Sequence, residues 1–95
     1  MLIELKKLII VNEGYKRNIS LNKMYINSDH IISITDYNGA KQFLISEGSQ
    51  EFVNESFSLI KVSNLNKSED IIVLGSSQEI FSKFNETKKG VLLNG

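Results

Sequence analysis

Apolar residues in this chain occur in short runs, and each run ends at residues that favour turns. The runs at positions 2–11, 31–37, 57–62 and 71–74 are rich in Ile, Val, Leu and aromatic side chains, and Asn, Ser or Gly follows each of them. Short runs with many β-branched residues are typical of β-strands. The pattern therefore favours strands over helices for most of the chain.

Two hairpins follow from this pattern. Residues 15–21 alternate from side to side and predict a second strand, which pairs with residues 2–11. The Asn38-Gly39 pair tolerates positive φ angles and predicts a type I′ turn from the strand at 31–37 to a returning strand at 41–46. The remaining expected segments are an extended piece at 24–26, a turn at 27–29, an irregular stretch at 47–55 and a polar connection at 64–70.

The segment from residue 71 to residue 84 predicts a buried strand followed by a short helix. Residues 71–74 are all apolar, which is typical of a strand that is covered on both faces. Gly75 ends this run, and Ser76 stands three residues before Glu79, the spacing of a helix capping box. One apolar face of about two helical turns is then expected from Ile80, Phe81 and Phe84.

The chain has 95 residues, which is the size of one domain with one modest core. We therefore predict a single β-rich domain over residues 1–95 of the mainly β (α+β) class. The expected architecture is a curled antiparallel sheet or small barrel of five to six strands, with one short C-terminal helix packed on it. Residues 86–95 lose the helical pattern, and they are expected either to be flexible or to donate a strand.

Two groups of spaced residues stand out, Ile26-Asn27 with Ile31 and Ile34, and Val73 with Ser76, Glu79 and Ile80. In this layout the chain resembles a group of small proteins of the flagellar FlbD or swarming-motility type, and short phage-encoded or mobile-element-encoded proteins built alike. The resemblance covers most of the chain, although residues 40–55 look like an insertion and the tail is longer, which leaves a shared partner open. It implies a compact β-rich module that works by contact, without enzymatic activity or a cofactor.

Side chains suited to catalysis or metal binding are scarce. Without cysteine the chain has no disulfide and no thiolate metal site. His30 is the only histidine and lies beside Asp29, with Asp36 not far away, whereas zinc and iron sites need three or four converging ligands. We therefore expect an exposed turn histidine, no catalytic, metal-binding or cofactor-binding residues, and no cofactor.

The Gly75-Ser76-Ser77 turn has three interpretations. A helix start presents free N–H groups to anions, but this turn lacks the further glycines and the lysine of a phosphate-binding loop. A serine nucleophile needs a base, and His30 is the only imidazole available. Helix capping is the favoured interpretation, ahead of anion binding and catalysis.

Basic residues gather in the first quarter of the chain, near Tyr15 and Tyr25. They are the candidates for contact with nucleic acid, namely Lys6, Lys7, Lys16, Arg17 and Lys23. Basic and aromatic side chains together bind a phosphate backbone and stack on bases, but the chain has zero net charge, whereas such proteins usually carry a basic excess. Lysines on edge strands also discourage aggregation, which is the simpler explanation.

The N-terminal run does not predict a signal peptide or a membrane segment. Glu4, Lys6 and Lys7 interrupt it, and its longest uncharged apolar stretch is residues 8–11. Apolar residues make up 41% of the chain and charged residues 23%, the balance of a soluble globular protein. We therefore expect a location in the host cytoplasm or in a virion, and no association with membranes.

These observations predict a non-enzymatic protein-interaction module, a small phage or mobile-element accessory protein with a structural or regulatory role. The alternative is a nucleic-acid-binding regulator that uses the basic N-terminal strands. The expected partner is another protein or a second copy of the chain, because small sheets leave unpaired edges. The basic beginning and the acidic middle, residues 29–55, are suited to meet between the subunits of a homo-oligomer or larger assembly.

Overall fold

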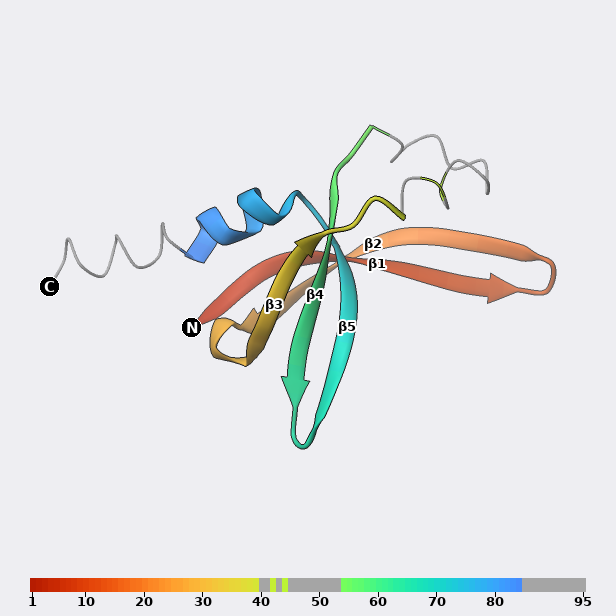
Figure 1. Ribbon diagram of the computed structural model, residues 1–95. Helices are drawn as coiled ribbons and strands as arrows, with labels where there is room; N and C mark the ends of the chain where they lie inside the picture. The colour runs from red at the N-terminus through yellow and green to blue at the C-terminus, as the bar shows by residue number, and fades with distance from the viewer. Residues whose placement is uncertain (40–41, 43, 45–53, 85–95) are drawn as a thin grey trace, which may run out of the picture.

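The computed structural model describes residues 1–39, 42, 44 and 54–84 (Figure 1). The described chain forms one five-stranded antiparallel sheet, in the order β2-β1-β5-β4-β3, that does not close into a barrel. The elements are β1 (Leu2–Glu13), β2 (Lys16–Asn27), the 3-10 helix η1 (Ser28–His30), β3 (Ile31–Asp36), β4 (Phe57–Asn64), β5 (Lys67–Leu74) and a C-terminal helix over residues 77–84. The predicted mainly β class, with one short C-terminal helix, is confirmed.

Both hairpins of the sheet are longer than the sequence pattern predicts. β1 and β2 pair at all twelve positions, so the expected pieces at 15–21 and 24–26 belong to one continuous strand. β4 and β5 pair from Phe57↔Leu74 to Asn64↔Lys67, so the predicted polar connection at 64–70 is wrong except at the turn residues 65–66. In the turn between them Leu65 has a φ of 56°, a left-handed conformation that glycine and asparagine adopt more readily.

The predicted type I′ hairpin after β3 does not form. Neither Asn38 nor Gly39 has the positive φ angle that this turn needs. The expected returning strand at 41–46 falls largely outside the described residues, and its two described positions, Gln42 and Leu44, have helical backbone. β3 pairs instead with β4, which follows about twenty residues later in the chain.

Two apolar clusters cover opposite faces of the sheet. Along β5, Ile71 and Val73 belong to one cluster, whereas Ile72 and Leu74 pack against the other. Because successive side chains of a strand point to opposite faces, this division confirms that residues 71–74 are covered on both sides. The first cluster consists of Ile3, Leu5, Ile60, Ile71, Val73 and Ile80, and the second of Leu8, Leu44 and Phe57.

The C-terminal helix covers the first cluster with two of its three large apolar residues. Ile80 is 1% exposed, and Phe84 packs against the cluster from one helical turn later. Phe81 was expected in the core, but it is 56% exposed and contacts Phe84 edge to face, with ring centroids 6.4 Å apart. Residues i and i+4 share a helix face, whereas residue i+1 is turned by about 100°, which explains the difference.

No helix within the described residues is both long enough and apolar enough to cross a bilayer. The expected tail at 86–95 lies outside the described residues.

Candidate interaction surface

The β1–β2 hairpin extends beyond the rest of the sheet (Figure 1). β1 is bridged to β5 at the Lys7↔Val73 pair, and further along β1 its only strand partner within the described chain is β2. Leu8, Ile19 and Leu21 anchor the middle of the hairpin through the second apolar cluster. Residues 9–18, at the outer end of the hairpin, therefore form a two-stranded projection, which we call the arm.

The arm exposes apolar side chains on both of its faces. Ile10 and Val11 are each more than 40% exposed, and they point to opposite faces because they are neighbours on one strand. Tyr15 stands at the turn of the arm and is 97% exposed. Apolar groups gathered on a projecting element are typical of surfaces that contact other molecules.

The register divides the basic residues that were predicted to bind nucleic acid. Lys6 stands directly opposite Lys23, so both lie on one face of the hairpin, and Lys7 lies on the other face opposite Asn22. On the face of Lys6 and Lys23, the Nζ atom of Lys23 lies 3.1 Å from the Glu4 Oε1 atom. Arg17 pairs with Asn12 and Lys16 with Glu13 near the arm turn. The five residues do not form one continuous patch.

β2 and β3 are the edge strands, and no strand of the described chain pairs with the outer side of either. Although they lie at opposite edges, they are consecutive in the chain and only η1 joins them, so the sheet is curled. At this end, the Ser28 N–H donates to the Met1 carbonyl at 2.9 Å and the Asp29 N–H to Asn27 Oδ1 at 3.0 Å. The outer sides of β2, with twelve residues, and of β3, with six, thus each present a row of backbone groups from alternate residues, which another strand can bind.

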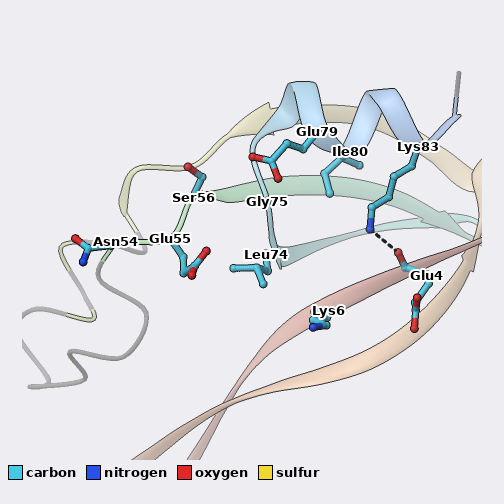
Figure 2. Close-up of a pocket in the computed structure, with 10 residues that line it drawn as sticks. All are labelled: Glu4, Lys6, Asn54, Glu55, Ser56, Leu74, Gly75, Glu79, Ile80 and Lys83. Atoms are coloured by element: carbon cyan, nitrogen blue, oxygen red, sulfur yellow. Dashed lines mark hydrogen bonds between the residues drawn. The ribbon is translucent and has the colours of Figure 1, made fainter. Parts of the chain in front are cut away.

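A cleft of about 430 Å³ lies between the C-terminal helix, β1 and the segment 54–56 (Figure 2). Glu55 and Glu79 bring carboxylates to it, and Lys6 and Lys83 bring ammonium groups. The Lys83 Nζ atom donates to the Glu4 carbonyl at 3.1 Å, which ties the helix to β1 across the cleft. With Glu4 the lining contains three carboxylates and two ammonium groups, so the cleft has no strong excess of either charge, and it has no histidine.

The helix start beside this cleft is occupied by capping contacts. Ser76 Oγ accepts from the Glu79 N–H at 3.2 Å, and the Ser76 carbonyl accepts from the Ile80 N–H at 3.0 Å. Glu79 Oε1 accepts from the Ser76 hydroxyl at 3.2 Å rather than from its backbone, a variant of the predicted capping box. Asp36, at the end of β3, accepts from the Ser77 N–H at 2.8 Å.

These contacts confirm that Gly75-Ser76-Ser77 ends a buried strand and caps a helix. The carboxylates of Asp36 and Glu79 place negative charge where an incoming anion would have to bind. His30 is exposed in η1, at the opposite end of β3 from Asp36, so these two side chains do not converge. Within the described residues, no group of three or more His, Cys, Asp or Glu side chains is arranged to hold a metal ion.

Sequence reasoning missed the contact between Asp36 and Ser77, which joins residues 41 positions apart. The Ser77 backbone N–H, followed by the Ser77 side chain, lowers the pKa of Asp36 below its ordinary value. An aspartate just before a Tyr-Asn-Gly segment has the local signal of a turn, and no local pattern shows that it caps a distant helix.

We expect Ser76→Ala to lower the free energy of unfolding by about 1 kcal/mol, because a helix start loses its capping acceptor. Ser82→Ala in the same helix is the matched control. The Ser82 hydroxyl donates to the Gln78 carbonyl of the preceding turn, and such a bond adds little to helix stability. Urea denaturation followed by circular dichroism measures both variants. Equal stability of Ser76→Ala and the wild-type protein would contradict the capping role.

The lowered pKa of Asp36 predicts a pH dependence of stability. In the folded protein this carboxylate binds its proton at a lower pH than in the unfolded chain. Its contribution is therefore complete above the unfolded pKa, about 4, and is lost as the pH falls through the folded pKa. Asp36→Asn keeps a hydrogen-bond acceptor but removes the charge. We expect its melting temperature to lie below that of the wild-type protein near neutral pH and the gap to close in acid, and a gap that is independent of pH would contradict this.

Comparison of the chain with models of protein families, with curated proteins and with solved structures found no match. The fold and the surface thus define a small antiparallel β protein with a projecting hairpin, without assigning it to a family.

Proposed function

We propose that this chain is a non-enzymatic protein-interaction module whose contact surface is the β1–β2 hairpin. The observation that carries the proposal is the twelve-residue strand β2, which lies at the edge of the sheet and continues into the arm. An extended edge strand binds partners by strand addition, in which backbone hydrogen bonds supply affinity and alternate side chains supply specificity. The exposed Ile10, Val11 and Tyr15 add apolar contact area next to this edge.

The biological setting that we propose is a small accessory protein of a phage or mobile element, with a structural or regulatory role. This part of the proposal rests on the resemblance to small flagellar-type and phage-encoded proteins. A contact module of this kind needs no cofactor and no convergent catalytic groups. Its genomic neighbours provide the test, because virion, flagellar and replication genes beside it would each indicate a different process, and neighbours of none of these kinds would count against this setting.

Photo-cross-linking in the producing cell tests the contact surface. A benzophenone amino acid at Tyr15 places the probe at the turn of the arm, and the same amino acid at Leu65 is a matched control. Both side chains are 97% exposed and both stand at hairpin turns, but Leu65 lies on the β4–β5 hairpin. We expect discrete protein adducts from position 15 and few from position 65. The proposal fails if position 15 gives no protein adduct, or if both positions give the same set.

Binding of nucleic acid is the second candidate, and one observation favours it. Lys6 and Lys23 share a face of the hairpin with Tyr25, and a two-stranded ribbon fits the major groove of DNA. Titration with single- and double-stranded DNA and RNA at two salt concentrations tests it, because the phosphate contribution is strongest at low salt. Absence of binding at low salt would exclude this candidate. We expect that result, because Glu4 forms an ion pair with Lys23 and the chain has zero net charge.

A further inference from the structure

The two edges of the sheet carry opposite charge. β2 has three basic residues, Lys16, Arg17 and Lys23, and no acidic residue along its twelve positions. At the other edge, η1 and β3 contain Asp29 and Asp36 and neither lysine nor arginine. One sheet therefore presents a basic edge and an acidic edge, and both have an outer side without a strand partner within the described chain.

The same separation extends beyond the edges. The β1–β2 hairpin has five basic residues, Lys6, Lys7, Lys16, Arg17 and Lys23, against the two acidic residues Glu4 and Glu13. The rest of the described chain has the reverse excess, with the acidic residues Asp29, Asp36, Glu55, Glu69, Asp70 and Glu79 against Lys61, Lys67 and Lys83. The whole chain has zero net charge. A neutral molecule with separated charges is complementary to another copy of itself.

We propose that the β2 edge of one copy pairs with the β3 edge of a second copy, so that the partner of the contact surface is this same chain. The inference rests on the proposed function, since it names the partner for the same strand edge. Pairing β2 with β2 would place two basic strands side by side. Pairing β3 with β3 would place two strands that contain only acidic charges side by side. Only the pairing of unlike edges brings the basic residues of β2 close to the acidic residues of η1 and β3, where opposite charges attract and like charges repel.

The pairing of unlike edges has a consequence for the size of the assembly. A single contact between two different surfaces leaves one basic and one acidic edge free at the ends of the pair. Such a contact continues until it closes into a ring, or it grows as an open filament. β3 has six residues and β2 has twelve, so the pairing covers about half of β2. The rest of β2 then remains available to a further contact.

Sedimentation velocity of the purified full-length chain over a series of concentrations tests the proposal. We expect association at high concentration, either into a closed ring, of which a dimer is the smallest, or into larger open species. We also expect a shift toward the monomer when salt rises from about 50 mM to about 500 mM, because salt screens exposed charges. Arg17→Glu on β2 and Asp29→Lys in η1 should each weaken the association about fivefold or more. A mixture of the two variants should associate more strongly than either alone, because the reversed charges are again complementary.

Lys67→Glu is the matched control for these variants. It reverses the charge of an exposed residue at the β4–β5 turn, away from both edges. It changes the net charge of the chain by the same amount as Arg17→Glu. We expect it to associate like the wild-type protein. Asp36 is left unchanged in these tests because its carboxylate caps the C-terminal helix. Circular dichroism of each variant checks that the fold is intact.

Two results would overturn the pairing of unlike edges. They are a monomer at every concentration, and association of both edge variants equal to that of the wild-type chain. The cross-linking experiment at position 15 distinguishes failure of this edge pairing from failure of the proposed function. Adducts to a different protein together with a monomeric chain would remove self-association but keep the interaction module. A monomeric chain without any protein adduct would remove both.

Discussion

Replacing Ile80 with alanine is expected to lower the free energy of unfolding by about 2–5 kcal/mol, the usual range for truncating a large buried aliphatic side chain. Ile80 is 1% exposed and packs in the first apolar cluster with residues of β1, β4 and β5. The strands around it are held by their ladders, so they cannot close the space that the side chain leaves. Urea denaturation followed by circular dichroism measures the loss.

Phe81→Ala is the matched control, because it removes a larger apolar side chain from the next position of the same helix. Phe81 is 56% exposed, and its ring contact with Phe84 is expected to contribute about 1 kcal/mol or less. The smaller side chain should therefore have the larger effect. A loss of stability in Phe81→Ala that equals or exceeds the loss in Ile80→Ala would show that the helix packs with a different face on the sheet.

The sequence predicts the start of the C-terminal helix well because its signals are local. Gly75, Ser76 and Glu79 lie within five residues, and the capping contacts join Ser76 to Glu79. The burial of residues 71–74 is predictable for a related reason, since four apolar residues in a row have no polar face to expose. The sequence does not determine which face of the helix packs on the sheet, because Ile80, Phe81 and Phe84 are compatible with two adjacent orientations of the helix.

The strand pairing after β3 depends on distant contacts, and local signals misled the prediction. Asn38-Gly39 is a strong hairpin signal, but β4 takes the pairing edge of β3 and Asp36 binds Ser77, so the chain leaves the sheet at this point. The first half of β5 was missed for the opposite reason. Residues 67–70 are polar and exposed, and pairing with β4 rather than burial makes them a strand.

The candidate surface could be predicted only in part. The division of Lys6 and Lys7 between two faces follows from the strand period of two and needs no structure. The charge of each edge, by contrast, depends on which strands lie at the edges. The strand order of the sheet places β2 and β3, which are consecutive in the chain, at opposite edges. No local sequence pattern indicates this order.

Gly75→Ala is the second substitution with a large expected effect. Gly75 has a φ of +115°, a conformation that residues with a Cβ rarely adopt. A Cβ at this position would lie 3.3 Å from the Ile80 Cδ1 atom, in the packed cluster beneath the helix. We expect a loss of about 1–3 kcal/mol from backbone strain alone, with a further loss if Ile80 has to move.

The backbone at Gly75 cannot rotate to relieve this strain. Its N–H donates to the Ser56 carbonyl at 2.7 Å, and its carbonyl accepts from the buried Ser58 hydroxyl at 2.7 Å. Rotation would leave the Ser58 hydroxyl buried without a partner, which costs about 1–3 kcal/mol. Gly14→Ala is the matched control, because Gly14 has a φ of +64° in the ordinary left-handed region and an added Cβ meets nothing within 4 Å. Thermal denaturation should show a clearly larger loss for Gly75→Ala, and equal losses would mean that its two hydrogen bonds and the contact with Ile80 do not constrain this turn.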